Sequence, residues 1–275
     1  MSSPSDLISL ATVKAFLNVT DPSKDDATLG MMITQVSRAI ISNINRNSFL
    51  PRSFSEIRNG DGKQKMMLKN FPVLSISSLT VDGTAITAAP ALLPNAPTSS
   101  GYVFEPADDE PPGSNQSIML RGLCFNRGGQ NVLVSYVAGY QVTGEAAVIP
   151  ASPFQLTTSQ PYGVWGSDMG VMKAGVAMTK VAMAPISGQY SVDGNGKYTF
   201  AAADTGAAIS ISYGFIPADL ANAAMEWIAD RWKYRERIGV ASKSLGGQET
   251  VSFKISDTPS FVKLVLQQYT RTVTL

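Results

Sequence analysis

The sequence predicts an α+β fold, in which helices from both ends of the chain form a bundle and antiparallel β segments are inserted between them. Near each end, apolar residues recur at three- and four-residue steps, as in an amphipathic helix. Between the ends, residues 51–213 contain short β-prone runs separated by turn residues. Hydrophobic residues make up 44% of the 275 positions and charged residues only 16%, so the chain can bury a large core.

Residues 1–50 predict two helices, at 7–19 and at 22–45. Asp21 or Thr20 can cap the second helix, and Pro22 suits its first turn. The apolar positions of this second helix follow the helical period: Leu29, Met32, Ile33, Val36, Ile40 and Ile44. Asn47 and Pro51 predict its end.

Residues 51–144 predict a first β insertion, a small antiparallel sheet or barrel. Its expected strands are Phe54–Arg58, Lys65–Leu68, Leu74–Val81, Gly101–Phe104, Ser117–Leu120 and Asn131–Tyr136. Asp82-Gly83 is a turn signal. Gly60-Asp61-Gly62-Lys63 lacks half of a phosphate-binding loop, so it is interpreted as a hairpin turn.

Residues 145–213 predict a second β insertion. Its expected strands are Thr179–Met183, Gln189–Val192, Tyr198–Phe200 and Ala208–Tyr213. Asp193-Gly194-Asn195-Gly196 is a turn signal between two of them. Trp165 lies in an expected loop between glycines, where it could anchor an interface, stack on a sugar, or cover the edge of the β core.

Residues 214–275 return to helix. Pro217 opens a helix that continues to Ile238 and stops before Gly239. A polar stretch at 242–249 precedes an expected strand at Thr250–Ile255. The last predicted helix begins at Asp257-Thr258-Pro259.

The composition argues against an enzyme or a metal site. The chain has no histidine and one cysteine, which removes the usual general base and the commonest metal ligand. Cys124, in the apolar run Leu123–Phe125, is expected to be buried. The acidic triplet Asp108-Asp109-Glu110 matches no calcium-binding loop and is interpreted as a solvated loop. We therefore predict no catalytic residue, no metal and no cofactor, although a pair of carboxylates could still serve a glycosidase.

The sequence predicts no contact with a membrane. No apolar segment approaches the roughly 20 residues that span a bilayer. The N-terminal residues lack the pattern of a signal peptide, so synthesis in the cytosol is expected. The net charge of +1 at pH 7 creates no global attraction for nucleic acid, so any contact with DNA must come from a local patch.

The order of elements resembles that of the head–tail connector, or adaptor, proteins of tailed double-stranded-DNA bacteriophages. The residues that carry the resemblance fall within 7–50 and 213–272, and in the second range they are Tyr213, Pro217, Asp219-Leu220, Ala221–Ala224 and Arg235-Glu236. Residues 52–140 resemble the β inserts of longer connectors, and residues 188–213 resemble small β modules of phage structural proteins.

The resemblance implies a structural protein of the virion neck, made in the host cytoplasm. Such proteins form a ring, typically of twelve copies, beneath the portal; the ring extends the DNA channel and offers a surface to a tail or stopper protein. Because C-terminal segments of the family commonly dock on the portal, the resemblance implies that these residues bind it: Phe261, Val262, Val265, Leu266, Tyr269, Arg271, Val273 and Leu275. The alternative is that the last helix packs on its own subunit.

The end of the long C-terminal helix is basic, owing to Arg231, Lys233, Arg235 and Arg237. In a ring these residues could face DNA phosphates without reading the base sequence, or could form salt bridges between subunits. They could equally be a solvated helix end paired with Glu236 and Asp230. A second functional class also stays open, in which the β segments form a carbohydrate-binding or decoration module on the virion surface.

Overall fold

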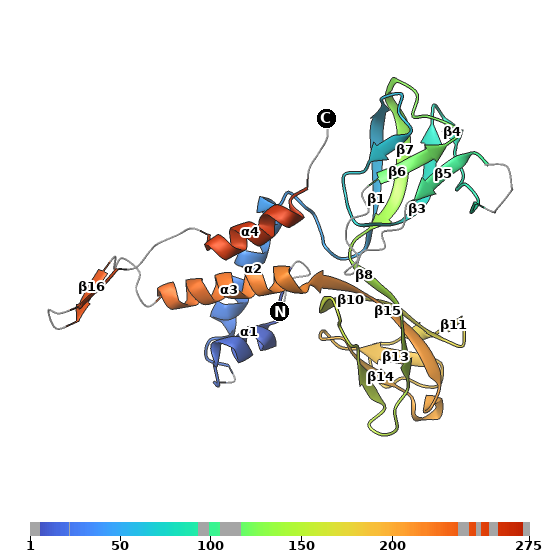
Figure 1. Ribbon diagram of the computed structural model, residues 1–275. Helices are drawn as coiled ribbons and strands as arrows, with labels where there is room; N and C mark the ends of the chain where they lie inside the picture. Colours follow the sequence, from blue (N-terminus) through green and yellow to red (C-terminus); the bar gives the residue numbers. More distant parts are fainter. Residues whose placement is uncertain are drawn as a thin grey trace. The chain divides into compact units, whose positions relative to one another are not determined.

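The computed structural model describes residues 6–21, 23–92, 99–104, 117–235, 242–245, 249–252 and 258–271. Within these residues it contains four α-helices and several sheets whose strands are mostly antiparallel (Figure 1). The predicted α+β class is confirmed, and β-strands supply most of the elements.

The chain divides into two compact units. The helical unit consists of Met1–Asn47 and Ile216–Thr270, and the β unit consists of Ser48–Phe215 with Arg271–Leu275. The two ends of the sequence therefore build one unit, and the middle builds the other.

The helical unit contains α1 (Leu10–Leu17), α2 (Asp26–Asn43), α3 (Ala218–Tyr234) and α4 (Ser260–Tyr269). α1 and α2 contact each other, both contact α3, and α3 contacts α4. The core consists of the apolar faces of these helices: Val13, Leu29, Ile33, Val36, Ile40, Leu220, Ala223, Ala224, Trp227, Ile228, Val262, Val265 and Leu266.

The helix ends follow local capping chemistry. The Ser9 side chain accepts a hydrogen bond from the Thr12 amide, and Asn18 ends α1 in the left-handed conformation. The predicted cap Asp21 accepts hydrogen bonds from the amides of Ser23 and Lys24, both at 3.0 Å, and these bonds lower the pKa of its carboxyl. α2 itself begins at Asp26, later than predicted, and its N-cap residue is Asp25.

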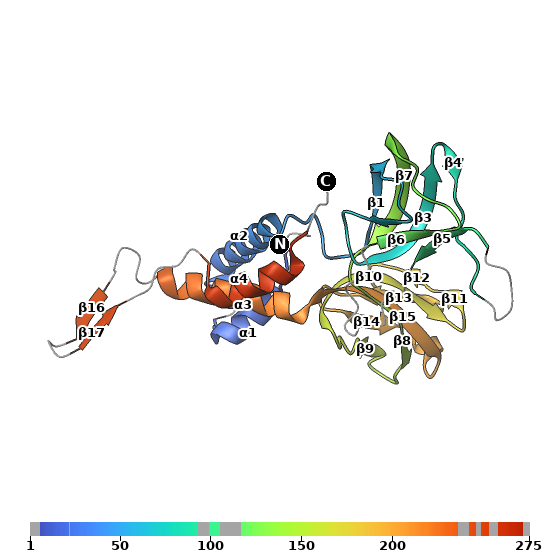
Figure 2. The ribbon, with the colours of Figure 1, turned by 45° about the horizontal axis from the view of Figure 1, so that its top comes forward.

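Two further strands lie between α3 and α4. β16 (Ser242–Leu245) and β17 (Glu249–Ser252) pair antiparallel, with Ser242 opposite Ser252 and Leu245 opposite Glu249 (Figure 2). The sequence predicted one strand at Thr250–Ile255 and a polar stretch before it. The prediction for residues 242–249 missed a strand, because Ser242–Leu245 forms β16, the partner of β17.

The first part of the β unit holds two antiparallel sheets. One has the order β1-β7-β3-β4, from Arg52–Gly60, Gly128–Ala138, Val73–Val81 and Thr84–Ala85. The other has the order β2-β6-β5, from Lys65–Met67, Ser117–Arg121 and Gly101–Phe104. Their buried residues form one core that includes Leu68, Leu79, Ile118, Leu120, Phe125, Val132, Val134 and Tyr136. Residues 61–64 connect β1 of one sheet to β2 of the other, so the predicted hairpin turn at 60–63 is wrong.

The second part of the β unit holds two four-stranded sheets. The first has the order β11-β10-β15-β8, from Val176–Ala177, Gly163–Lys173, Ala208–Pro217 and Gln141–Val148. The second has the order β12-β13-β14-β9, from Thr179–Lys180, Gln189–Val192, Lys197–Phe200 and Gln155–Thr157. A short 3₁₀ turn, η1 (Ala202–Asp204), precedes β15.

β8, β9 and β10 were not predicted, and Trp165 lies in β10 rather than in the expected loop. β10 contains several glycines, which weaken a strand signal. At Gly166 a Cβ atom would lie 2.4 Å from a methyl carbon of Leu50, so the Leu50 side chain would have to move to admit one. Within the described part of the chain, no helix has the length and apolar character needed to cross a membrane.

Candidate functional site

The candidate site is the surface formed by α4 and by the end of α3. The C-terminal end of α4 is held against the start of α3, because the Tyr269 hydroxyl donates to the Asp219 carboxylate at 2.7 and 2.9 Å. The Arg46 guanidinium, just after α2, donates through Nε to the Tyr269 carbonyl at 2.9 Å. One tyrosine thus joins three segments of the helical unit.

α4 has one buried face and one exposed face. Val262, Val265 and Leu266, all predicted to bind a portal, are buried in the helical unit with at most 5% exposure. Phe261 is 43% exposed and Leu264 is 61% exposed. Leu264 was not among the predicted portal residues, although its place off the buried stripe follows from the helical period.

The predicted portal residues beyond α4 are described only in part. Arg271 is partly buried, and its Nε atom makes no hydrogen bond within the described residues. Val273 and Leu275 lie outside those residues. Among the predicted portal residues that the structure describes, Phe261 is the apolar residue whose side chain is exposed.

The basic residues at the end of α3 do not form one patch. Arg231 stacks over Trp227 at 5.4 Å, and Arg235 stacks over Trp232 at 3.8 Å, measured from the guanidinium carbon to the ring centroid. Lys233 is exposed, and its position in the helix places it away from Arg231 and Arg235. Arg237 lies outside the described residues.

Arg235 also forms an ion pair with Asp25 at 3.5 Å. Asp25 precedes α2, so this pair connects the end of α3 to the start of α2 within one subunit. Asp230 and Glu236 were the partners expected in one interpretation of this helix end. The contact with Asp25 was not predicted, because α2 and α3 are far apart in sequence.

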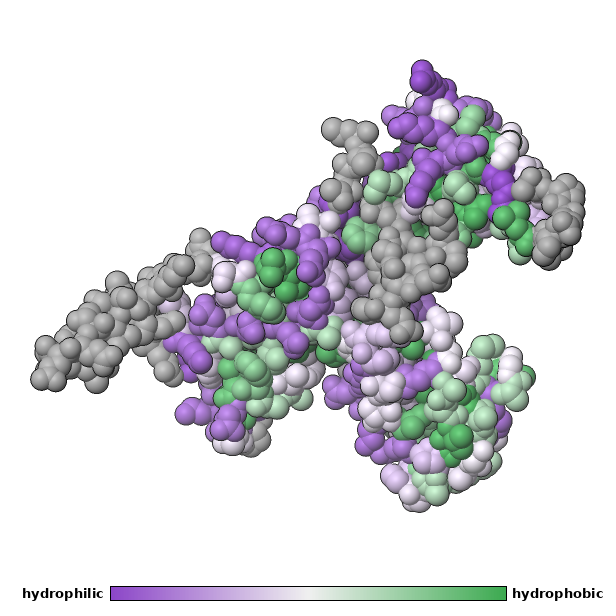
Figure 3. Space-filling model, viewed as in Figure 1, coloured by the Kyte–Doolittle hydropathy of each residue, from purple (hydrophilic) through white to green (hydrophobic). Residues whose placement is uncertain are grey.

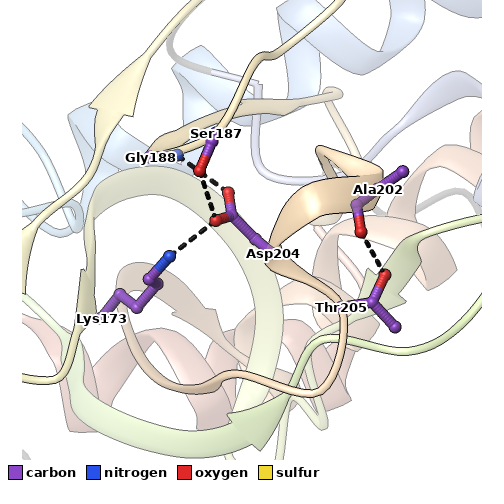
Figure 4. Close-up of polar contacts among 6 residues, drawn as sticks. All are labelled: Lys173, Ser187, Gly188, Ala202, Asp204 and Thr205. Carbon is purple, nitrogen blue, oxygen red and sulfur yellow. Dashed lines mark hydrogen bonds and ion pairs between the residues drawn. The ribbon is translucent and has the colours of Figure 1, made fainter.

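Two buried carboxylates hold the second part of the β unit together. Asp204 is 2% exposed and accepts hydrogen bonds from the Lys173 ammonium at 2.6 Å, the Ser187 hydroxyl at 2.9 Å and the Gly188 amide at 2.8 Å (Figure 4). These bonds, that from Lys173 most of all, lower the pKa of Asp204. The arrangement fixes the chain before β13 to the turn before β15.

Asp168 holds the neighbouring strands in the same way. Its carboxylate accepts hydrogen bonds from the hydroxyls of Tyr190 at 2.8 Å and Tyr198 at 3.0 Å, and Lys180 lies 3.1 Å away. Burial, together with this carboxylate, raises the pKa of both tyrosines. Asp168 and Asp204 are each matched by a lysine and saturated with donors, which suits packing better than acid–base chemistry.

Trp165 covers part of this network. Its indole Nε1 donates to the Tyr198 hydroxyl at 3.4 Å, and a Cβ atom on Gly196 would lie 2.6 Å from the indole ring. The ring therefore lies against the β13–β14 turn. This position supports the interpretation of Trp165 as a residue that covers the edge of the β core. It gives no support to the alternative in which the ring stacks on a sugar.

Cys124 is exposed, so its predicted burial is wrong. Its neighbour Phe125 is fully buried, whereas Leu123 is 40% exposed. The apolar run places only one of its three side chains in the core. Among the described residues there is no group of three or more cysteine, aspartate or glutamate side chains that could hold a metal ion.

Comparison with known proteins adds one informative match. The family model described as "HCP: Head completion protein" matches residues 6–104, which include α1, α2 and the strands from β1 to β5. This match confirms the resemblance to head–tail connectors. It overlaps the range 7–50 and extends through most of the first β insertion.

The other comparisons decide less. No curated protein matches the chain. One solved structure, "Neck of empty GTA particle computed with C6 symmetry", covers 100% of this chain and 95% of its own, with 13% identity and a TM-score of 0.41. Similarity at that level decides neither the fold nor the function.

Proposed function

We propose that the protein is a structural head–tail adaptor of a phage-like virion, located at the neck. The observation that carries the proposal is the match of residues 6–104 to a head completion family. The protein would act by shape and contact, without turnover or a cofactor.

The helical unit would be the connector core, a bundle of helices from both ends of the chain. Several large apolar side chains stay exposed on its helices, including Phe16, Phe261 and Leu264. Exposed apolar surface of this kind is typical of a subunit that buries part of its exterior on assembly. We propose that about twelve such units form a ring beneath the portal and extend the DNA channel, with a tail or stopper protein attached on the other side.

The portal contact is best assigned to the exposed side of α4 and to the residues that follow it. Phe261, Arg271, Val273 and Leu275 would meet the portal, whereas Val262, Val265 and Leu266 would support them by packing within the subunit. The hydrogen bond from Tyr269 to Asp219 would hold this surface in place.

Contact with DNA is proposed only for the part of the basic cluster that remains exposed. Lys233, which lies away from Arg231 and Arg235 on the helix, would face phosphates in the channel, a contact that reads no sequence and weakens with salt. Arg235 is already paired with Asp25, so its charge would contribute less.

A density-gradient experiment tests the proposal. Purified protein is mixed with assembled portal rings and sedimented, and the fractions are analysed for both chains. The proposal expects co-migration at a fixed ratio, with a Phe261→Glu variant binding more weakly than a matched Asn222→Glu variant, whose exposed site lies on α3. Failure of the wild-type protein to migrate with portals would end the proposal.

A further inference from the structure

The β16–β17 hairpin forms a sheet of its own. It has two strands of four residues each, and neither strand pairs with a third strand among the described residues. A two-stranded hairpin alone in water is marginally stable at best, because a third strand or a packed face is needed to hold it. Each edge of the hairpin also has backbone N–H and C=O groups that a further strand can bind.

β8 is an unusually long edge strand. In the sheets of the β unit, most edge strands have two to four residues, whereas β8 has eight and β1 has nine. Proteins commonly protect a long edge with charged side chains, since an open edge pairs with other chains, and β1 carries Arg52 and Arg58. The one charged residue of β8, Glu145, is held within the subunit. Its carboxylate accepts hydrogen bonds from the Tyr213 hydroxyl at 2.7 Å and the Ser159 amide at 2.8 Å.

The open edge of β8 is formed by the backbone of Ala146 and Val148. The Ile149 amide donates to the Ala207 carbonyl at 3.0 Å, on the side where β8 pairs with β15. Backbone groups in an antiparallel pair point alternately toward the partner strand and away from it. The amides and carbonyls of Ala146 and Val148 therefore point away from β15. β8 is the last strand of its sheet in the described part of the chain, so no further strand meets these groups there.

This stretch of β8 is regular and exposed. Glu145–Val148 pairs with Ala208–Ile211 without a register shift, and the shift in this pairing lies before Glu145. The uninterrupted stretch thus has the same length as each strand of the hairpin. Val148 is 58% exposed, and hydrophobic residues lie at the surface of this part of the β unit (Figure 3). A strand added at this edge would continue the sheet and cover part of its exposed surface.

We propose that the β16–β17 hairpin of one copy adds to the β8 edge of a neighbouring copy, through hydrogen bonds to the backbone of Ala146 and Val148. The inference rests on the proposed ring, because it names surfaces that join neighbouring subunits. Every copy carries one hairpin and one β8 edge. A contact between two different surfaces closes into a ring when the rotation between copies permits closure. In the free subunit both surfaces remain unpaired.

Hydrogen exchange followed by mass spectrometry tests the contact. The free full-length protein is compared with the same protein bound to assembled portals. We expect exchange to slow several-fold on the portals, both in peptides that cover β16 and β17 and in the peptide that contains Ala146 and Val148. Protection of only one of the two regions, or of neither, would overturn the inference. Protection of both in the free subunit would also overturn it, because the pairing would then lie within one chain.

Two variants at one position show whether the β8 edge is the partner of the hairpin. Ala146→Pro removes the outward amide and spares the bonds to β15, since proline is tolerated at an edge position of this kind, whereas Ala146→Ser keeps the amide. Both free proteins should keep the circular dichroism spectrum of the wild type. On portals, the hairpin should lose its protection in Ala146→Pro and keep it in Ala146→Ser.

The outcomes separate the inference from the proposed function. Equal protection of the hairpin in the two variants would overturn the inference. If wild-type protein migrated with portals but showed no slower exchange, the proposed function would stand and the ring would use other surfaces. If wild-type protein did not bind portals at all, both would fail.

Discussion

Removing the charge of Asp204 should destabilise the β unit measurably. In Asp204→Asn the side chain keeps its shape, but it loses the charged partner of Lys173. Its new NH₂ group must also face either the Gly188 amide or the Lys173 ammonium, which are both donors. A hydrogen bond to a charged group contributes about 1.5–3 kcal/mol, and Lys173 is partly exposed, so water can replace part of the loss. We expect a loss of about 2–3 kcal/mol in the free energy of unfolding at pH 7.

The assay is urea unfolding of the full-length protein, followed by fluorescence. The matched control is Asp193→Asn, which removes a carboxylate that accepts two backbone amides in an exposed turn and should cost about 1 kcal/mol or less. The pKa of Asp204 is lower in the folded protein, so its stabilisation is complete above the unfolded pKa of about 3.9 and is lost as pH falls through the folded value. The difference between wild type and Asp204→Asn should therefore shrink below about pH 4. A loss under about 0.5 kcal/mol at pH 7, or a difference unchanged at pH 3, would refute the reasoning.

Three further outcomes are expected. Tyr269→Phe removes the bonds to Asp219 and should lower the stability of the helical unit by about 1–2 kcal/mol in urea; no change would show that these bonds contribute nothing. Gly30→Ala should raise the stability of the free subunit by about 0.5–1 kcal/mol, and a lower melting temperature would contradict the open space at that position. Cys124 should react with a thiol reagent in the native state as fast as in urea, and strong protection would show that it is buried.

The helices were predictable because each has a regular apolar face and a partner for that face within the same unit. The period correctly indicated that Val262, Val265 and Leu266 share a side of α4. It could not show what covers them, since a face that packs on α3 and a face that binds another protein have the same spacing.

Many strands were predictable because short β-prone runs are bounded by turn residues, as in β7. β10 carries a glycine, Gly166, beside the Leu50 side chain, and that proximity depends on the tertiary structure. In the run around Cys124, three consecutive apolar residues fit either register, so the sequence did not indicate which side chain enters the core.

No local pattern in the sequence indicated that the side chains of Asp168 and Asp204 would be buried and hydrogen-bonded. Asp204 is isolated, and its partners Lys173 and Ser187 come from other strands and loops. The same holds for Arg235, whose ion-pair partner Asp25 belongs to the opposite end of the chain. Contacts of this kind follow from the fold, whereas capping and turn residues act on their neighbours and could be predicted.

Mass photometry of assembled portals, with and without a saturating amount of the protein, tests the central claim most directly. An adaptor ring predicts one discrete species heavier than the portal by a fixed whole number of 29.2 kDa chains, close to twelve. A portal whose mass stays unchanged at saturation would contradict it.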